Sequence, residues 1–210
     1  METLTRPVID WHVESVPFEG ESGTGDRGGV RIDEHRIFAF VIDALGHGAD
    51  AAQMADLAER CLGAVELDIR LEAMIENCHR EFIGTRGTAM CLAYLDARTH
   101  VLNWLSVGNI QAVRIQLDSH GMPQFESLVM RGGVVGDRLP ELRASRISLK
   151  PGDMVVMATD GVGYGWYGEY RPNIGAGELA RALRLRHCHG KDDALVLAFR
   201  YLGLNGGASP

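Results

Sequence analysis

The feature that most constrains the fold is a run of short β-type segments between residues 88 and 130. Apolar and β-branched residues fill TAMCLAYLD (88–96), HVLNWLSVG (100–108), AVRIQL (112–117) and QFESLVM (124–130). The breaks at Asp96–His100, Gly108–Asn109 and Ser119–Pro123 have the composition of turns. Strands joined by such short breaks pair antiparallel, because a parallel pair needs a long crossover. The run therefore predicts an antiparallel meander.

The rest of the chain adds buried strands and amphipathic helices. Residues 15–29 are rich in glycine and polar residues and predict a loop. Apolar spacing of three and four residues predicts the helices, with Asp50 as the expected N-cap of the first. The expected strands are 8–14, 37–43, 146–153, 154–160 and 192–201, and the expected helices are 50–65, 69–83 and 178–186. This order predicts an α+β protein, with helices packed on a large antiparallel sheet system.

Length and composition predict one domain. The chain has 210 residues, 46% of them hydrophobic, which suffices for one sizeable core. No change of composition marks a linker. We expect a single domain over residues 1–203 and a disordered tail over 204–210.

Charge and hydropathy exclude two classes of partner. The formal charge of −7 argues against non-specific nucleic-acid binding, which requires basic patches. It suits a protein that gathers carboxylates around cations, and equally a protein with ordinary solubility charge. No apolar run approaches the roughly 18–20 residues of a membrane helix. The N-terminal sequence METLTRPVIDWHVES lacks the pattern of a signal peptide, so we expect a cytoplasmic protein.

The segment GTGDRG (23–28) matches the glycine pattern of dinucleotide-binding loops. Such a loop needs a helix N-terminus directly after it, to bind the phosphates. The residues that follow, VRIDEHRIFAFVID, have the pattern of strands instead. This context excludes the dinucleotide interpretation and leaves Asp26 as the distinctive residue of the loop.

Acidic residues recur where apolar strands meet polar turns. Asp43 ends IFAFVI, Asp160 ends MVVMAT, Asp192 and Asp193 precede ALVLAF, and Asp26 lies in the glycine-rich loop. Any one of these acids could also be there only because aspartate is common in the turns that follow strands. If the strand ends share one edge, however, the carboxylates converge and require cations between them. Oxygen ligands favour Mg²⁺ or Mn²⁺, and two such ions can clamp a phosphate.

Six motifs together resemble a known family. GTGD, VIDALGHGADA, RGTAMCLAYLD, SVGN, ATDGV and KDDALVLAF occur in the order seen in the metal-dependent Ser/Thr protein phosphatases of the type-2C-like superfamily. The resemblance is strongest to the bacterial SpoIIE/RsbX branch and covers about residues 20–199. It implies an αββα sandwich, in which two antiparallel sheets face each other between outer helices.

The resemblance also implies a set of ligands for two Mn²⁺ or Mg²⁺ ions. Asp43 would bridge both ions. Asp26 and the main-chain carbonyl of residue 44 would hold the second ion. Asp160 and Asp192 would complete the coordination of the first. A metal-activated water would then attack the phosphorus of phosphoserine or phosphothreonine directly, without a phosphoenzyme.

Four further positions each allow more than one role at the expected site. Asp193 would be either a minor ligand or a support for the ligands, with Gly161 beside it. Arg27 is a candidate for contact with the phosphate, and equally a solvated loop arginine. His47 is either the general acid that protonates the leaving group or a packing residue at a helix start. Ala44 replaces the family's usual glycine, which has easier access to positive φ, and this puts the second ion in doubt.

The expected function is therefore a cytoplasmic metal-dependent phosphoprotein phosphatase. The resemblance implies that its substrates are phosphorylated STAS-domain proteins of a stressosome-type complex. One alternative is a phosphatase of a phosphorylated anti-sigma-factor antagonist. Another is a catalytically weak module that binds phosphoproteins, and the alanine at position 44 favours it.

The four cysteines show no C-x-x-C spacing. Cys61 and Cys78 fall on the apolar faces of expected helices, and Cys91 falls in an expected strand. We expect free thiols, not disulfides or a zinc site.

Overall fold

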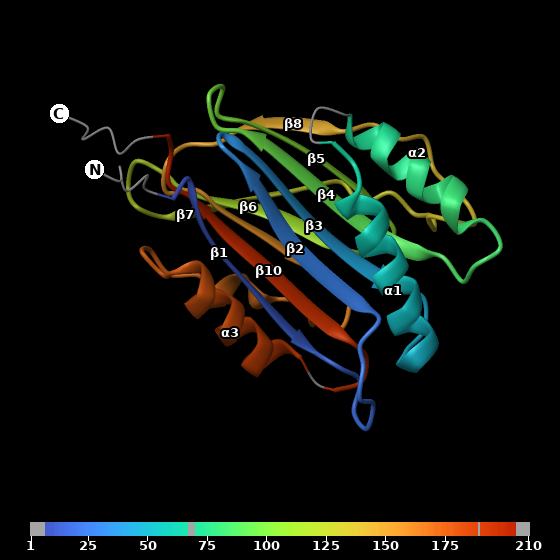
Figure 1. The fold of residues 1–210 in the computed structure, drawn as a ribbon. Helices are drawn as coiled ribbons and strands as arrows, with labels where there is room; N and C mark the ends of the chain where they lie inside the picture. The colour runs from blue at the N-terminus through green and yellow to red at the C-terminus, as the bar shows by residue number, and fades with distance from the viewer. Residues whose placement is uncertain (1–6, 67–69, 189, 205–210) are drawn as a thin grey trace, which may run out of the picture.

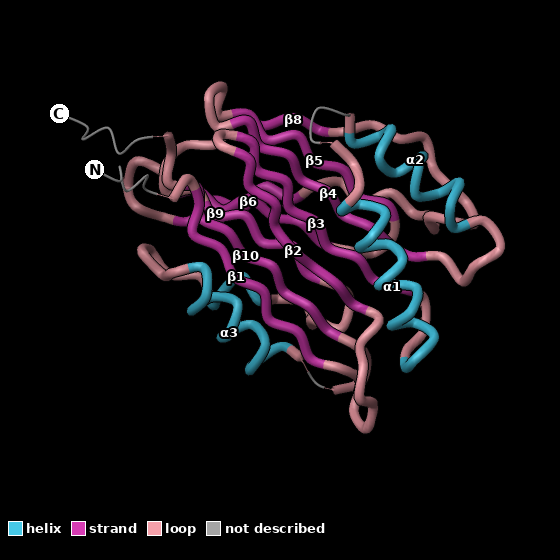
Figure 2. Tube along the Cα trace, in the orientation of Figure 1, coloured by secondary structure: helices cyan, strands magenta, loops and turns pink. Residues whose placement is uncertain are grey.

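The computed structural model describes residues 7–66, 70–188 and 190–204. Its described elements form a four-layer sandwich, in which two sheets lie face to face between helices (Figures 1 and 2). The strands are β1 (Ile9–Val16), β2 (Asp26–Asp33), β3 (Arg36–Ala44), β4 (Thr88–Asp96), β5 (Val101–Val107), β6 (Gln111–Leu117), β7 (Pro123–Ser127), β8 (Ser145–Ser148), β9 (Met154–Ala158) and β10 (Ala194–Tyr201). The helices are α1 (Gly48–Gly63), α2 (Leu71–Phe82), the 3₁₀ helix η1 (Trp166–Glu169) and α3 (Ala176–His187).

Both sheets are five-stranded, and every pair of adjacent strands is antiparallel. The first sheet has the order β1-β10-β9-β6-β7, and the second has the order β2-β3-β4-β5-β8. Helices α1 and α2 cover the second sheet, while α3 covers the first (Figure 2). The predicted α+β class and αββα sandwich are confirmed.

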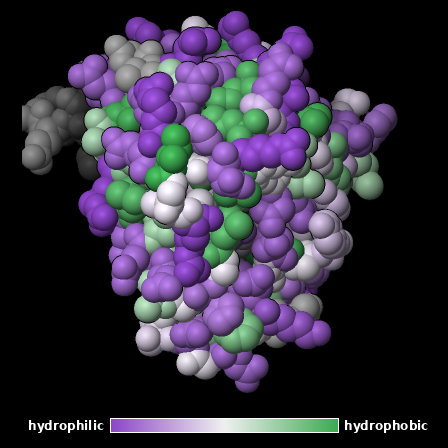
Figure 3. All heavy atoms as spheres, turned by 90° about the vertical axis from the view of Figure 1, so that its right-hand side faces the viewer, coloured by the Kyte–Doolittle hydropathy of each residue, from purple (hydrophilic) through white to green (hydrophobic). Residues whose placement is uncertain are grey.

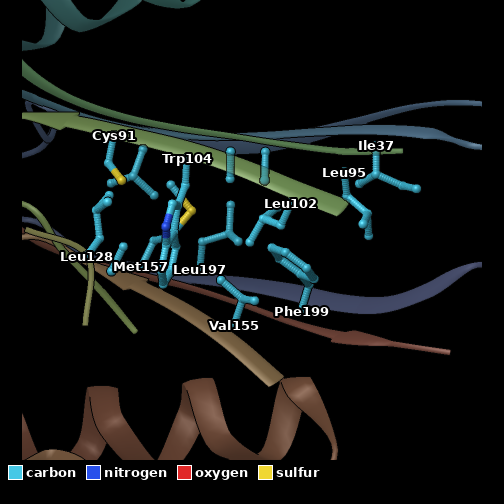
Figure 4. Packing of buried hydrophobic residues seen from close by; sticks show 14 of the residues in the cluster. Ile37, Cys91, Leu95, Leu102, Trp104, Leu128, Val155, Met157, Leu197 and Phe199 are labelled. Carbon is cyan, nitrogen blue, oxygen red and sulfur yellow. The ribbon is translucent and has the colours of Figure 1, made fainter. Parts of the chain in front are cut away.

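Three hydrophobic clusters fill the spaces between the four layers. On β3, Ile37, Ala39 and Val41 face the other sheet, whereas Phe38 and Phe40 face the helices. Strands β4, β9 and β10 alternate in the same way. Figure 4 shows the cluster between the sheets, with side chains from both sheets pointing into one core. Both faces of these strands are buried, which explains why their sequences are continuous apolar runs.

The predicted meander is wrong in one respect. Strands β4 and β5 form one hairpin and β6 and β7 another, but the two hairpins belong to different sheets. The chain changes sheets at Gly108, whose φ is +98°. A Cβ at Gly108 would lie 2.4 Å from the Cβ of Ala89, so this crossing accepts only glycine. A two-residue break that resembles a hairpin turn is thus the connection between the two layers.

Two local boundaries also differ from the sequence predictions. Helix α1 begins at Gly48 with His47 at the N-cap position, so Asp50 lies inside the first turn. There Asp50 stabilises the helix dipole without capping it. Strand β2 already begins at Asp26, so the loop predicted over 15–29 ends earlier. Glycines 28 and 29 are accommodated in the strand because Leu195 and Phe40 fill the space beside them.

Parts of two predictions lie outside the described residues. These are residue 69 of the second predicted helix and residues 205–210 of the predicted tail. Among the helices of the described segments, none has both the length and the apolar character to span a membrane.

Candidate metal centre

The acids singled out from the sequence gather at one edge of the sandwich. Asp26 is the first residue of β2 and pairs with Asp43 near the end of β3. Asp160 follows the end of β9, and Asp192 and Asp193 precede β10, which pairs antiparallel with β9. The edge lies at the lower right of Figure 1, where β1 leads into β2 and β10 begins. The antiparallel pairings thus bring acids that are far apart in sequence to the same end of both sheets.

A direct hydrogen bond joins the two sheets at this edge. The hydroxyl of Thr159, which follows β9, donates to Oδ2 of Asp26 over 2.8 Å. The same hydroxyl accepts a hydrogen bond from the backbone N–H of Leu195 on β10, also over 2.8 Å. Thr159 is buried and therefore fixes the position of the Asp26 carboxylate relative to the opposite sheet.

Burial and like charge together disfavour the ionised form of Asp26. The side chain is 2% exposed. Loss of solvation, and next the negative charge of Asp43, raise the pKa of Asp26 to about 8. The Thr159 hydrogen bond opposes this shift, while Asp193 and Asp160 add to it. A cation beside Asp26 would relieve this electrostatic cost.

Asp43 is subject to the same forces. Burial raises its pKa to about 7, with further contributions from the charges of Asp160, Asp192 and Asp193. Asp43 continues the alternation of β3, in which Ala39 and Val41 face the other sheet, so it lies on the side of those acids. Its backbone carbonyl accepts a hydrogen bond from the hydroxyl of Thr88 over 2.7 Å.

Asn109 orients Asp160. Its side-chain amide donates to Oδ2 of Asp160 over 2.6 Å. Burial and the negative charge of Asp192 raise the pKa of Asp160, and the Asn109 hydrogen bond opposes the shift. Asn109 directly follows Gly108, so the segment that passes from one sheet to the other also positions the Asn109 side chain beside Asp160.

Asp193 braces the loop that precedes Asp26. Its Oδ1 accepts from the N–H of Phe18 and its Oδ2 from the N–H of Gly25, both over 2.7 Å. The carbonyl of Gly25 in turn accepts from the N–H of Ala44 over 3.1 Å. Both carboxylate oxygens thus bind amides of this loop, and the residue is 4% exposed.

Gly161 is required by a close approach of two chain segments. A Cβ at this position would lie 2.0 Å from the carbonyl oxygen of Asp193. No side chain fits there, so the turn after Asp160 packs directly against the backbone before β10.

Ala44 is accommodated without backbone strain. It is the last residue of β3, and the non-glycine residues of the described chain with positive φ are Glu34, His100 and Asn173. Its side chain is buried in the cluster beneath α1. Position 44 therefore has a backbone conformation that alanine adopts at no cost in this structure.

Arg27 connects β2 to α1. Its Nε and Nη2 donate to Oδ1 of Asp56 over 3.0 and 2.7 Å, and its Nη1 donates to the carbonyls of Thr24 and Asp26. Contact with a phosphate would require this guanidinium to leave Asp56. The contacts favour a bracing role.

His47 stacks on Phe18 at the start of α1. The ring centroids lie 4.7 Å apart, and Nδ1 lies 3.2 Å from Oε1 of Glu21. The His47 side chain is 52% exposed, so it remains accessible to a substrate.

Sequence reasoning missed three polar residues at this edge, namely Thr88, Asn109 and Thr159. A signal existed for Thr159, the one hydroxyl in the apolar run MVVMAT before Asp160. Asn109 and Thr88 lie in segments that were expected to act only as turns or strand starts.

The donor atoms at this edge decide which kind of cation it suits. Within the described residues, no three His, Cys, Asp or Glu side chains are placed as a group that could hold a metal ion. The donors that meet at the edge are nevertheless all oxygen atoms, and Asp26 and Asp43 are costly to ionise without a counter-charge. This donor set fits a hard divalent cation.

Comparisons with known proteins agree with this fold. The family model described as Stage II sporulation protein E (SpoIIE) matches residues 33–165. The phosphoserine phosphatase RsbX of Bacillus subtilis is 23% identical over 194 residues, which span 87% of this chain and 92% of RsbX.

Two solved structures superpose over most of the chain. One is described as "The bacterial stressosome: a modular system that has been adapted to control secondary messenger signaling"; it has a TM-score of 0.81 and 28% identity and covers 91% of this chain and 99% of its own. The other is RsbX in complex with magnesium, with a TM-score of 0.78 and 18% identity over 95% of this chain and 97% of that one. The family model spans well over half of the sequence, and the chain belongs to the SpoIIE family.

Proposed function

We propose that this protein is a metal-dependent phosphatase of phosphoserine and phosphothreonine in proteins. The observation that carries the proposal is the convergence of Asp26, Asp43 and Asp160 from two sheets on one edge, where the Thr159 hydrogen bond joins the sheets. The relative named phosphoserine phosphatase RsbX supports the reaction, and the RsbX structure with magnesium supports a divalent cation.

We assign two Mg²⁺ or Mn²⁺ ions to this edge. Asp43 would contact both, Asp26 and the carbonyl of Ala44 would hold one, and Asp160 and Asp192 would hold the other. When bound, such ions lower the pKa of a coordinated water and neutralise phosphate charge.

The surrounding residues prepare these ligands. Thr159 holds Asp26 by its hydroxyl, Asn109 holds Asp160 by its amide, and Asp193 fixes the loop that ends in Gly25. Groups that orient ligands in this way typically contribute 10–100-fold to metal affinity or activity, as an order of magnitude. Because Asp26 and Asp43 have raised pKa values, ion binding near neutral pH would also release protons.

We also propose that residues 1–203 form one phosphatase domain and that the protein is cytoplasmic. For the substrate, we favour phosphorylated STAS-domain proteins of a stressosome-type complex. The RsbX relative and the structural neighbour described as a bacterial stressosome support this choice. Ala44 has no positive φ, and its carbonyl stays available as a ligand, which supports the enzyme over a binding module.

Replacement of Asp43 tests the metal-dependent reaction. We expect EDTA-stripped protein to release phosphate from a phosphoserine peptide and from p-nitrophenyl phosphate only after Mn²⁺ or Mg²⁺ is added. Asp43→Asn should reduce this rate by more than about 100-fold, because a ligand matters more than its supports. Asp33→Asn, at the opposite end of β2, is the matched control and should retain full activity. Release that is insensitive to metal, or equal in Asp43→Asn, would refute the proposal.

Replacement of His47 separates its two interpretations. His47 packs on Phe18 and contacts Glu21, so we expect His47→Ala to lower kcat by less than about 10-fold. General acid catalysis contributes about 100-fold or more. The measurement is kcat for the phosphoserine peptide at saturating metal. A loss as large as that of Asp43→Asn would assign proton transfer to His47.

The pH dependence of stability tests the electrostatics of the metal-free edge. The folded-state pKa of Asp26 lies near 8, above its ordinary value of 3.8. The folded chain therefore binds the proton of the Asp26 carboxyl group more tightly than the unfolded chain does. The free energy of unfolding consequently falls as the pH rises from about 4 to 8. Asp26→Asn should raise the free energy of unfolding in EDTA by more than about 1 kcal/mol at pH 8.5, and by less at pH 5.

Urea denaturation at both pH values measures this difference, with Asp33→Asn again as the control. Added Mg²⁺ should stabilise the wild type more than Asp26→Asn, because only the native site binds the ion. An Asp26→Asn effect that is the same at pH 5 and pH 8.5 would contradict the assigned electrostatics.

A comparison of two phosphoproteins tests the proposed substrate. We expect kcat/KM for a phosphorylated stressosome STAS protein to exceed that for a phosphorylated anti-sigma-factor antagonist by at least about tenfold, which is about 1.4 kcal/mol in transition-state binding. Mass spectrometry of each phosphosite follows the reaction, and Asp43→Asn serves as the blank. The reverse preference would favour the alternative, and retention of both phosphates by enzyme active on the peptide would exclude both substrates.

A further inference from the structure

Two cysteine thiols lie in contact between α1 and α2. The Sγ atoms of Cys61 on α1 and Cys78 on α2 are 3.0 Å apart. Both are free thiols, as expected from the sequence, and so are Cys91 and Cys188. A disulfide requires about 2.05 Å between its sulfur atoms, so a shift of about 1 Å would close this one.

The two thiols differ in accessibility. Cys78 is fully buried in the cluster beneath the helices. Cys61 is half-buried and lines a cavity of about 740 Å³, together with Arg60, Arg80 and Glu81. Figure 3 views the molecule from the side of α1 and α2 and shows apolar groups scattered among hydrophilic ones there. A small polar oxidant entering this cavity therefore reaches Cys61 before Cys78.

The environment also favours Cys61 as the reacting thiol. The hydrogen bond with Cys78 lowers the pKa of the Cys61 thiol, while partial burial and then the Glu81 carboxylate oppose this effect. The same hydrogen bond, together with burial, raises the pKa of Cys78. The thiolate is the nucleophile in thiol oxidation, so the first step is expected at the accessible member of the pair.

We propose that Cys61 and Cys78 form a peroxide-sensitive dithiol, which oxidises to a disulfide that ties α1 to α2. The Cys61 thiolate attacks hydrogen peroxide, the O–O bond breaks, and hydroxide leaves, so that Cys61 becomes a sulfenic acid. The sulfur of Cys78 then attacks the sulfenic sulfur. The S–O bond breaks, and the hydroxyl leaves as water with the proton of Cys78. In sum, two thiols and one peroxide give one disulfide and two waters.

The packing of the helices favours an intramolecular bond. Cys78 belongs to the hydrophobic cluster beneath the helices, which includes Leu62 and Ile75, and Cys61 packs against the same cluster. Cys91 is fully buried between the sheets, and Cys188 lies beyond α3 on the opposite layer. Neither of these two shares the cavity beside Cys61.

Peptide mapping tests the proposal independently of any phosphatase activity. Trypsin cleaves after Arg60, Arg70 and Arg80, so Cys61 lies in the peptide 61–70 and Cys78 in the peptide 71–80. Cys91 and Cys188 lie in the separate peptides 87–98 and 187–191. We expect full-length protein treated with EDTA and then with equimolar peroxide to yield the linked pair 61–70/71–80. The pair should be two hydrogens lighter than the sum of its peptides and should separate on reduction.

Single variants identify the role of each sulfur. Cys61→Ser should abolish the linked pair, whereas Cys78→Ser should leave a sulfenic acid on Cys61 that dimedone traps. Cys188→Ser is the matched control and should form the linked pair as the wild type does. Native protein without the 61–70/71–80 pair, while Cys61 is trapped by dimedone or stays reduced, would overturn the proposal. So would linked peptides that contain Cys188 in equal amount.

Discussion

The hydroxyl of Thr159 joins the two sheets at the edge where their acidic residues gather. It donates to Asp26 on one sheet and accepts from Leu195 on the other, both over 2.8 Å. A buried carboxylate without this partner would lose its solvation without compensation. The repulsion among the acids of this edge would then favour separation of the sheets. The position of Asp26, and with it the form of the candidate metal centre, depends on this small polar contact.

The core of the protein stabilises an edge that is unfavourable in itself. Three hydrophobic clusters bury both faces of the central strands, and each fully buried Leu, Ile, Val or Phe contributes about 1.5–3 kcal/mol. The raised pKa values of Asp26 and Asp43 show that the same fold opposes their ionisation. The fold therefore maintains a cluster of carboxylates that is better suited to bind cations than to remain without them.

The sequence predicted the elements better than their arrangement. Apolar runs ending in Asp43 and Asp160 identified the buried strands and the acids at their ends. These runs have no alternation, because both faces of each strand are buried, so the pattern could not assign faces or sheets. It therefore missed the crossing at Gly108, which depends on a close approach to Ala89. Nor could it distinguish the adjacent Asp192 and Asp193, since the binding of two amides by Asp193 becomes visible only when the loop containing Phe18 and Gly25 is in place.

Helix α1 contacts both the candidate metal centre and the thiol pair. Asp50 in its first turn pairs with Arg86 over 3.0 Å, and Asp56 near its middle binds Arg27 beside Asp26. Near its other end, Cys61 meets Cys78 of α2. A change that displaced α1 along its axis would have to break the Arg27–Asp56 contact or alter the cluster beneath the helix. Because protein cores are densely packed, such a displacement is resisted along the whole helix. A covalent bond to α2 would therefore act on the same rigid element that braces the loop around Asp26.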